Sequence, residues 1–173
     1  MEAVALASPR EGLTRFFSAR HEFPDGWHRF LHETDPAGSH SLSLDLTAQR
    51  FSFLFRGKTI DLQACDVVLK LKPGAAYENG ANLSVDVRRE GGSVFLGKEL
   101  IAGALFHLPT ARLFGDQAEE PLGQWTLAIP SALLPALHSS LKKQVIVNNQ
   151  PQWRLNPDAI DDLWILARYR VTS

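Results

Sequence analysis

Apolar and polar residues alternate along several short stretches of this chain, which is the pattern of half-buried β-strands. The clearest stretch is residues 41–46, in which Leu42, Leu44 and Leu46 alternate with polar residues. Similar stretches recur at fairly regular intervals and are separated by glycine, proline or polar turn residues. The predicted strands span residues 41–46, 59–72, 81–89, 93–96, 124–129, 143–147 and 162–171.

The sequence also predicts a bulge, a hairpin turn and the position of one strand within its sheet. The apolar positions of residues 59–72 change parity, which predicts a β-bulge near Gln63–Ala64. Gly91–Gly92 lies between two alternating stretches, where a two-residue hairpin turn is expected. Residues 162–171 are apolar on both faces at their start, which predicts a strand inside a sheet rather than at its edge.

Residues 13–34 hold an unusual density of aromatic residues and are expected to form a helical cap on the strands. A first helix is expected from about Pro9 to just before Phe23, since the residue ahead of a proline is disfavoured in a helix. A second short helix is expected from Gly26, with Trp27 on its buried side. Trp27 is therefore predicted to be part of the core.

Three segments are less regular. Residues 47–55 fit either a helical turn or a strand that carries three phenylalanines on one face, and the helical turn is favoured. Residues 97–123 combine small residues, prolines and acidic residues, and are expected to be a long excursion with little regular structure. Residues 132–141 are expected to form a short helix after Ser131.

Short antiparallel strands without βαβ alternation predict an all-β fold, namely a two-sheet antiparallel β-sandwich of jelly-roll type with a short helical N-terminal cap. The length of 173 residues suits one domain. Residues 1–12 are expected to be a flexible lead-in and residues 13–173 the single sandwich domain, with the cap at residues 13–34.

Composition narrows the classes of partner. The chain has 18 basic and 19 acidic residues, and this balance argues against a nucleic-acid binder. No apolar run is long enough to span a membrane, and the N-terminus lacks the basic and apolar regions of a signal peptide. The single cysteine, Cys65, lies in an apolar stretch and is expected to be a buried thiol.

No catalytic motif is found in the sequence. His28 and His32 have the i, i+4 spacing that can present two imidazoles to zinc, but the glutamate of a His-Glu-x-x-His motif is absent. The histidines are therefore assigned to packing of the cap. No enzyme activity, metal site or cofactor is predicted.

Aromatic residues outside the predicted core strands are the candidate binding residues. If residues 97–123 form a recognition surface, Phe106 and Phe114 are its expected anchors, because aromatics supply much of the energy of protein interfaces. The other interpretation is that this segment folds back over the sandwich. Trp153, after a proline turn, is the candidate for stacking on a sugar ring.

Three segments together resemble a known family. They are residues 17–32 (Phe-Ser-Ala-Arg-His-Glu-Phe-Pro-Asp-Gly-Trp-His-Arg-Phe-Leu-His), residues 42–51 with 54–60, and residues 153–169. This composite pattern resembles the C-terminal region of the A components of insecticidal Tc (toxin complex) toxins and of their neuraminidase-like-domain relatives. The match covers about residues 13–72 and 122–171.

The resemblance implies a non-catalytic binding and assembly module that docks a partner protein, such as the B-type subunit of a bacterial toxin complex. It also implies virulence and a secreted or cell-surface location, whereas the sequence itself sets no localisation. Pore formation is not expected of a chain this short. The alternative is a carbohydrate- or receptor-binding β-sandwich whose ligand is a glycan or a cell-surface receptor.

Overall fold

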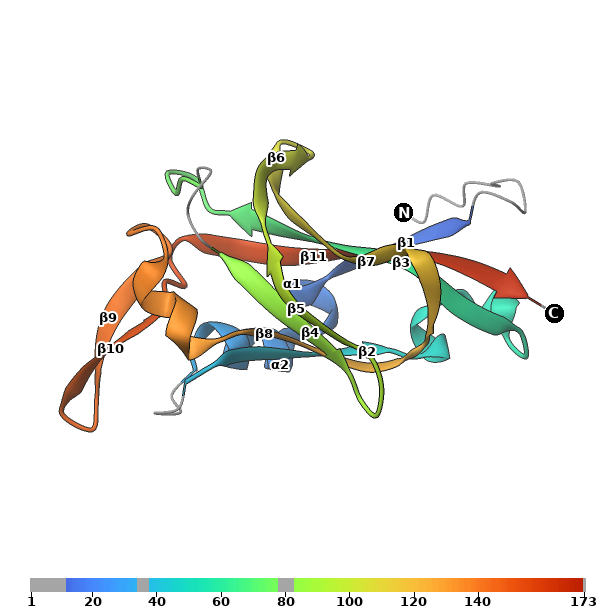
Figure 1. Cartoon of the computed structure of the whole chain (residues 1–173), viewed down its shortest axis with the longest axis horizontal. Helices are drawn as coiled ribbons and strands as arrows, with labels where there is room; N and C mark the ends of the chain where they lie inside the picture. The colour runs from blue at the N-terminus through green and yellow to red at the C-terminus, as the bar shows by residue number, and fades with distance from the viewer. Residues whose placement is uncertain (1–11, 34–37, 78–82, 173) are drawn as a thin grey trace.

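The computed structural model describes residues 12–33, 38–77 and 83–172, with the side chains of residues 116–118 excepted. Antiparallel strands dominate (Figure 1). A five-stranded sheet has the order β1 (Leu13–Ser18), β11 (Ile160–Thr172), β3 (Thr59–Leu71), β7 (Leu108–Pro121) and β6 (Ile101–Leu105). A four-stranded sheet has the order β2 (His40–Leu46), β8 (Gly123–Ile129), β4 (Ser84–Arg89) and β5 (Val94–Glu99). The predicted all-β class is confirmed, whereas the jelly-roll connectivity stays a prediction.

The two sheets share one hydrophobic core. Leu44 and Leu127 from the four-stranded sheet belong to the same buried cluster as Leu62 and Ile165 from the five-stranded sheet. The chain passes from one sheet to the other at single residues, Leu100 between β5 and β6 and residue 122 between β7 and β8. The first crossing joins two edge strands, β5 and β6, and the second joins two inner strands, β7 and β8.

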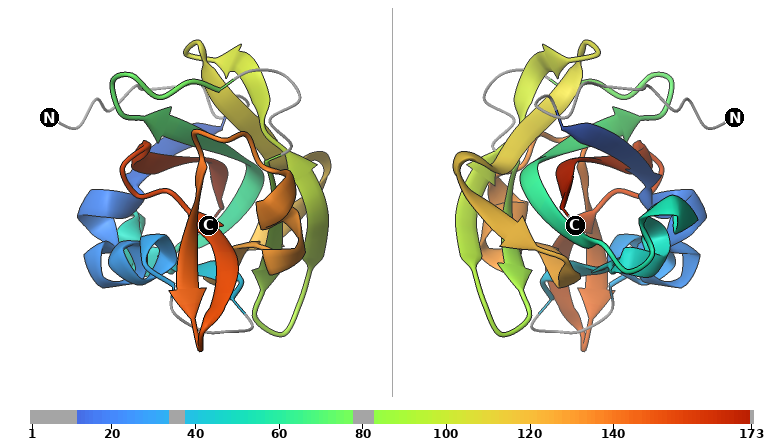
Figure 2. Two further views of the ribbon diagram at one scale, coloured as in Figure 1. Left: turned by 90° about the vertical axis from the view of Figure 1, so that its left-hand side faces the viewer. Right: turned by 90° about the vertical axis from the view of Figure 1, so that its right-hand side faces the viewer.

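Two short helices, α1 (Ala19–Glu22) and α2 (Pro24–Leu31), connect β1 at the edge of one sheet to β2 at the edge of the other. They cover that side of the molecule (Figure 2). α2 packs against β2, and its Trp27 and Phe30 rings stack with their centroids 5.6 Å apart. Trp27 is buried, as predicted.

The helix predicted from about Pro9 to Phe23 is wrong over residues 13–18, which form strand β1, whereas the residues just before Phe23 are helical and form α1. This strand pairs with β11, and the ring of Phe16 meets the ring of Trp164 edge-on at 5.3 Å. The periodicity of six residues is too short to distinguish a helix from a strand. Residues 13–18 form a strand because they pair with β11. The predicted lead-in lies outside the described residues except for Gly12.

The prediction for residues 97–123 is also wrong, since they form the end of β5, then β6, β7 and the start of β8. Phe106 and His107 make the turn between β6 and β7, and both have positive φ angles, 51° and 58°. Glycine or asparagine normally marks such a turn, so neither residue signals it in the sequence. Without a recognisable turn, the sequence of strand β7 resembles that of a loop.

Several finer predictions are confirmed. β3 shows a register shift between Leu62 and Ala64, at the predicted bulge. β4 and β5 pair across the predicted hairpin, and β11 lies between two other strands of its sheet. Residues 47–55 contain two helical turns of the 3-10 type, η1 (Ala48–Arg50) and η2 (Phe53–Phe55). A third, η3 (Ser131–Ala136), is shorter than the helix predicted at residues 132–141.

A separate two-stranded ribbon, β9 (Lys142–Val147) and β10 (Gln150–Leu155), projects at one end of the molecule (Figures 1 and 2). Its turn is made by Asn148 and Asn149, both with positive φ. β10 was not predicted, because Pro151 near its start suggests a loop. Proline is tolerated there because a strand at a sheet edge has an unpaired side.

Cys65 is buried on β3, as predicted. Burial raises the pKa of its thiol well above the ordinary value, which keeps the sulfur in the unreactive protonated form. No helix among the described residues is long and apolar enough to cross a membrane.

Candidate functional site

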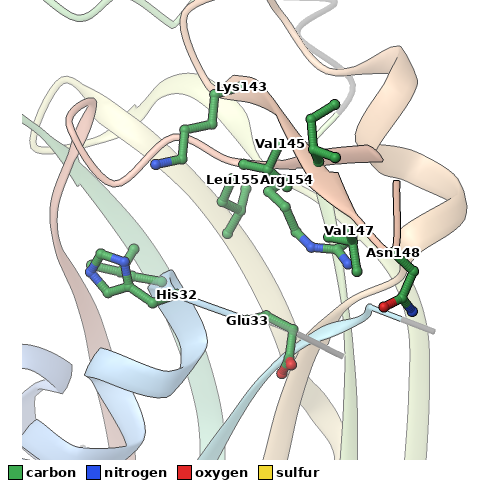
Figure 3. Close-up of a pocket in the computed structure, with 10 residues that line it drawn as sticks. His32, Glu33, Lys143, Val145, Val147, Asn148, Arg154 and Leu155 are labelled. Carbon is green, nitrogen blue, oxygen red and sulfur yellow. The ribbon is translucent and has the colours of Figure 1, made fainter. Parts of the chain in front are cut away.

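A cleft of about 460 Å³ lies between the end of α2 and the β9–β10 ribbon (Figure 3). Lys143 and Arg154 enter it from the ribbon, and His32 and Glu33 enter it from the residues that follow α2. The remaining wall is mostly aliphatic and consists of Leu31, Val145, Ile146, Val147 and Leu155, with Asn148 at the turn. The cleft therefore combines a hydrophobic wall with charges of both signs.

His40, at the start of β2, ties the two sides of this cleft together. Its Nδ1–H donates to the Phe30 carbonyl oxygen at 2.5 Å, and its Nε2 accepts from the Leu155 backbone N–H at 3.1 Å. A carbonyl only accepts and an amide N–H only donates, so both bonds require the neutral Nδ1–H tautomer. Burial, assisted by repulsion from the Arg154 guanidinium, lowers the pKa of His40.

Arg154 is held rigidly in the wall of the cleft. Its guanidinium donates to the Trp153 carbonyl oxygen at 3.1 Å and to the Gln152 side-chain oxygen at 2.7 Å. Gly38, with a φ of 38°, lies so close that an added Cβ would collide with the guanidinium. These contacts fix the charge of Arg154 in position in the wall of the cleft.

The predicted site residues fall in three different environments. Phe106 lies at the β6–β7 turn and is 59% exposed. Trp153 is half-buried, and the Lys142 ammonium lies over its ring at 4.7 Å from the centroid. Phe114 is only 7% exposed. The structure does not bring these three residues together.

Phe114 is excluded as a surface anchor. Its ring stacks on Phe95 at 5.3 Å and on Trp125 at 5.2 Å, between the two sheets. Residue 114 lies on the inner face of β7, a position that cannot be recognised unless residues 108–121 are known to be a strand. Phe114 therefore fits the other interpretation of residues 97–123, in which their apolar side chains pack on the sandwich.

Two exposed apolar side chains are not among the predicted binding residues: Ile146 on β9, which is 69% exposed, and Ile101 on β6. The Asn148–Asn149 pair is a signal that could have identified the ribbon, because asparagine tolerates positive φ in hairpin turns. No comparable signal marks Ile101, because its strand was not recognised.

Asp162 and the His28–His32 pair also carry side chains that could take part in chemistry. Asp162 is buried and accepts hydrogen bonds from Ser18 Oγ, the Trp164 indole N–H, and the backbone N–H groups of Arg20 and Leu163. A carboxylate with four donors is occupied in holding structure. The exposed rings of His28 and His32 lie 4.6 Å apart, and no group of three or more metal-ligating side chains occurs among the described residues.

Comparison of the chain with protein-family models, curated proteins and solved structures finds no match.

Proposed function

We propose that this chain is a non-catalytic binding module that holds a partner protein through its two projecting hairpins, β6–β7 and β9–β10. The observation that carries the proposal is the exposure of large apolar side chains on these hairpins, with Phe106 at 59% and Ile146 at 69%. Large apolar side chains presented on projecting hairpins are candidate anchors of a protein interface, because aromatic and apolar anchors supply much of the binding energy.

The hairpins supply the rigidity that an interface needs. Residues 142–147 pair with residues 150–155 in one continuous register, and the β6–β7 turn is fixed by two residues in the left-handed region. A preorganised side chain loses less conformational entropy on binding than a mobile one. Phe106 and Ile146 are therefore suited to act as anchors.

The cleft beside the ribbon supplies polar groups next to Ile146. Lys143 is exposed at its rim, and Arg154 and Glu33 lie within it. Interfaces commonly combine an apolar centre with a charged rim that selects the partner. A partner with a short apolar segment flanked by charges would complement this end of the molecule.

The partner we propose is a B-type subunit of a bacterial toxin complex. This identification rests on the sequence resemblance to the C-terminal region of Tc toxin A components. A secreted or cell-surface location belongs to the same proposal.

The test is a binding titration of the protein against an immobilised B-type subunit. Phe106→Ala and Ile146→Ala are each expected to weaken binding by more than about 1 kcal/mol, with unchanged melting temperatures. Phe53→Ala is the matched control, because Phe53 is also exposed but belongs to η2, a turn at the opposite end of the molecule from the ribbon (Figure 1).

Equal binding by all variants would contradict the proposal. Glycan-array binding that is lost in Trp153→Ala would instead favour the alternative, a carbohydrate- or receptor-binding module. Lys142 already covers one face of the Trp153 ring, so a sugar would have to stack on the other face or displace the ammonium.

A further inference from the structure

The turn formed by residues 52–58, hereafter the Phe53 turn, carries two adjacent exposed apolar side chains. Phe53 is 74% exposed and Leu54 is 64% exposed. The turn lies at the end of the molecule opposite to the β9–β10 ribbon (Figures 1 and 2). It therefore lies apart from the binding surface proposed above.

The exposure of these two side chains is imposed by the fold. Phe51 and Phe55, on either side of them, pack edge-on against Tyr169 of β11, with ring centroids 4.8 Å and 6.1 Å apart. The Phe55 N–H donates to the Ser52 carbonyl oxygen at 3.0 Å and closes the turn. With its flanks anchored, the turn holds Phe53 and Leu54 outward and cannot bury them against its own domain.

The apolar tip is bordered by positive charge. Arg56 and Lys58 are both exposed, and neither has an ion pair in the part of the chain that the structure describes. Arg50, just before the turn, lies 4.0 Å from Asp45, so that carboxylate already faces a cation. The surface around Phe53 and Leu54 is thus cationic.

We propose that the Phe53 turn docks peripherally on an anionic lipid surface. Phe53 and Leu54 would enter the boundary between headgroups and acyl chains, while Arg56 and Lys58 would contact lipid phosphates and carboxylates. Two apolar side chains and two cations give weak, reversible attachment, because stable anchoring normally requires more buried apolar area.

Co-sedimentation with vesicles tests the proposal. The full chain is expected to bind vesicles of phosphatidylcholine mixed with phosphatidylserine, to bind vesicles of phosphatidylcholine alone much more weakly, and to dissociate as salt is raised. The double substitution Phe53→Ser and Leu54→Ser should weaken binding by more than about tenfold. Its melting temperature should match that of the parent, because both side chains are exposed.

The contribution of charge is measured separately. The double substitution Arg56→Gln and Lys58→Gln is expected to weaken binding to the anionic vesicles by about thirtyfold. The matched control is Arg88→Gln with Lys143→Gln, which removes two exposed cations elsewhere on the surface. A loss of the same size in this control would attribute binding to net charge and overturn the proposal.

Phe106→Ser completes the design, because it removes an exposed aromatic from the other proposed surface. It should weaken binding to the B-type subunit and leave vesicle binding intact, so the two proposals fail independently. The lipid proposal is overturned if the parent does not bind anionic vesicles, or if Phe53→Ser with Leu54→Ser leaves vesicle binding unchanged. Loss of subunit binding alone in that variant would assign the turn to a protein interface.

Discussion

His40 contacts two segments that are far apart in the chain, the end of α2 and strand β10, and it can do so only as a neutral imidazole. Protonation would place an N–H opposite the Leu155 N–H and break that hydrogen bond. Burial lowers the pKa of His40 in the folded state below its ordinary value of 6.5. The unfolded chain therefore takes up a proton at a higher pH than the folded protein does.

This difference predicts how stability depends on pH. The free energy of unfolding should be at its full value above about pH 7 and should decrease as pH falls through 6.5 towards the lower folded-state pKa. His40→Gln should reduce this slope, because glutamine does not titrate. Urea denaturation at a series of pH values measures it, with the exposed His28→Gln as control. A parent slope no steeper than that of His40→Gln would contradict the prediction.

Asp162 provides a second prediction at the scale of one residue. Its buried carboxylate accepts from four donors on β1, α1 and β11, so its removal leaves several of them unsatisfied. Asp162→Ala is expected to lower the free energy of unfolding by about 3 kcal/mol.

The neighbouring Asp161 is the control for this substitution. It is more exposed and forms ion pairs with Arg20 at 2.6 Å and Lys70 at 2.8 Å. The hydrogen bond from Lys70 and the charges of Lys70 and Arg20 lower the pKa of Asp161. Ion pairs near the surface contribute little to stability, so Asp161→Ala should lower the free energy of unfolding by less than about 1 kcal/mol. Chemical denaturation measures both variants. An equal decrease in the free energy of unfolding for Asp162→Ala and Asp161→Ala would show that the hydrogen bonds of Asp162 do not make the larger contribution to stability.

At the scale of elements, the β6–β7 hairpin holds the exposed aromatic residue Phe106 in an unfavourable backbone conformation. Phe106 and His107 both occupy the left-handed region, which is unfavourable for residues other than glycine and asparagine. Replacing them by Asn-Gly (Phe106→Asn with His107→Gly) should raise the free energy of unfolding by about 1 kcal/mol. The same variant should bind the proposed partner more weakly.

Thermal denaturation and the binding titration together check this prediction. Asn149→Gly in the β9–β10 turn is the control, since asparagine already suits that position, and its effect on stability should be smaller. A drop in stability on introducing Asn-Gly would mean that Phe106 packs on the hairpin and is not held there for binding.

At the scale of the whole molecule, the stack of Phe95, Phe114 and Trp125 joins the two sheets. Phe114→Ala is expected to lower the free energy of unfolding by about 3 to 5 kcal/mol, because it opens a cavity between the sheets. The exposed Phe106→Ala should change it by less than about 0.5 kcal/mol. Urea denaturation compares them, and a small effect at Phe114 would show that the sheets do not depend on this stack.

The sequence by itself determined the strands whose side chains alternate over six or more residues, the bulge in β3, the interior position of β11 and the burial of Trp27 and Cys65. These properties follow from local periodicity and from the cost of exposing apolar surface, and both can be recognised from consecutive residues of the sequence. The all-β class follows from the same patterns.

Only the tertiary structure decided that residues 13–18 form a strand, that Phe114 is buried and Phe106 exposed, and that the ribbon and α2 enclose a cleft. Each depends on pairing with residues distant in the chain: β1 with β11, Phe114 with Trp125, and His40 with Phe30 and Leu155. Burial is a property of the assembled sheets, and a hairpin whose turn residues adopt positive φ without glycine or asparagine leaves no local signal by which sequence patterns reveal it.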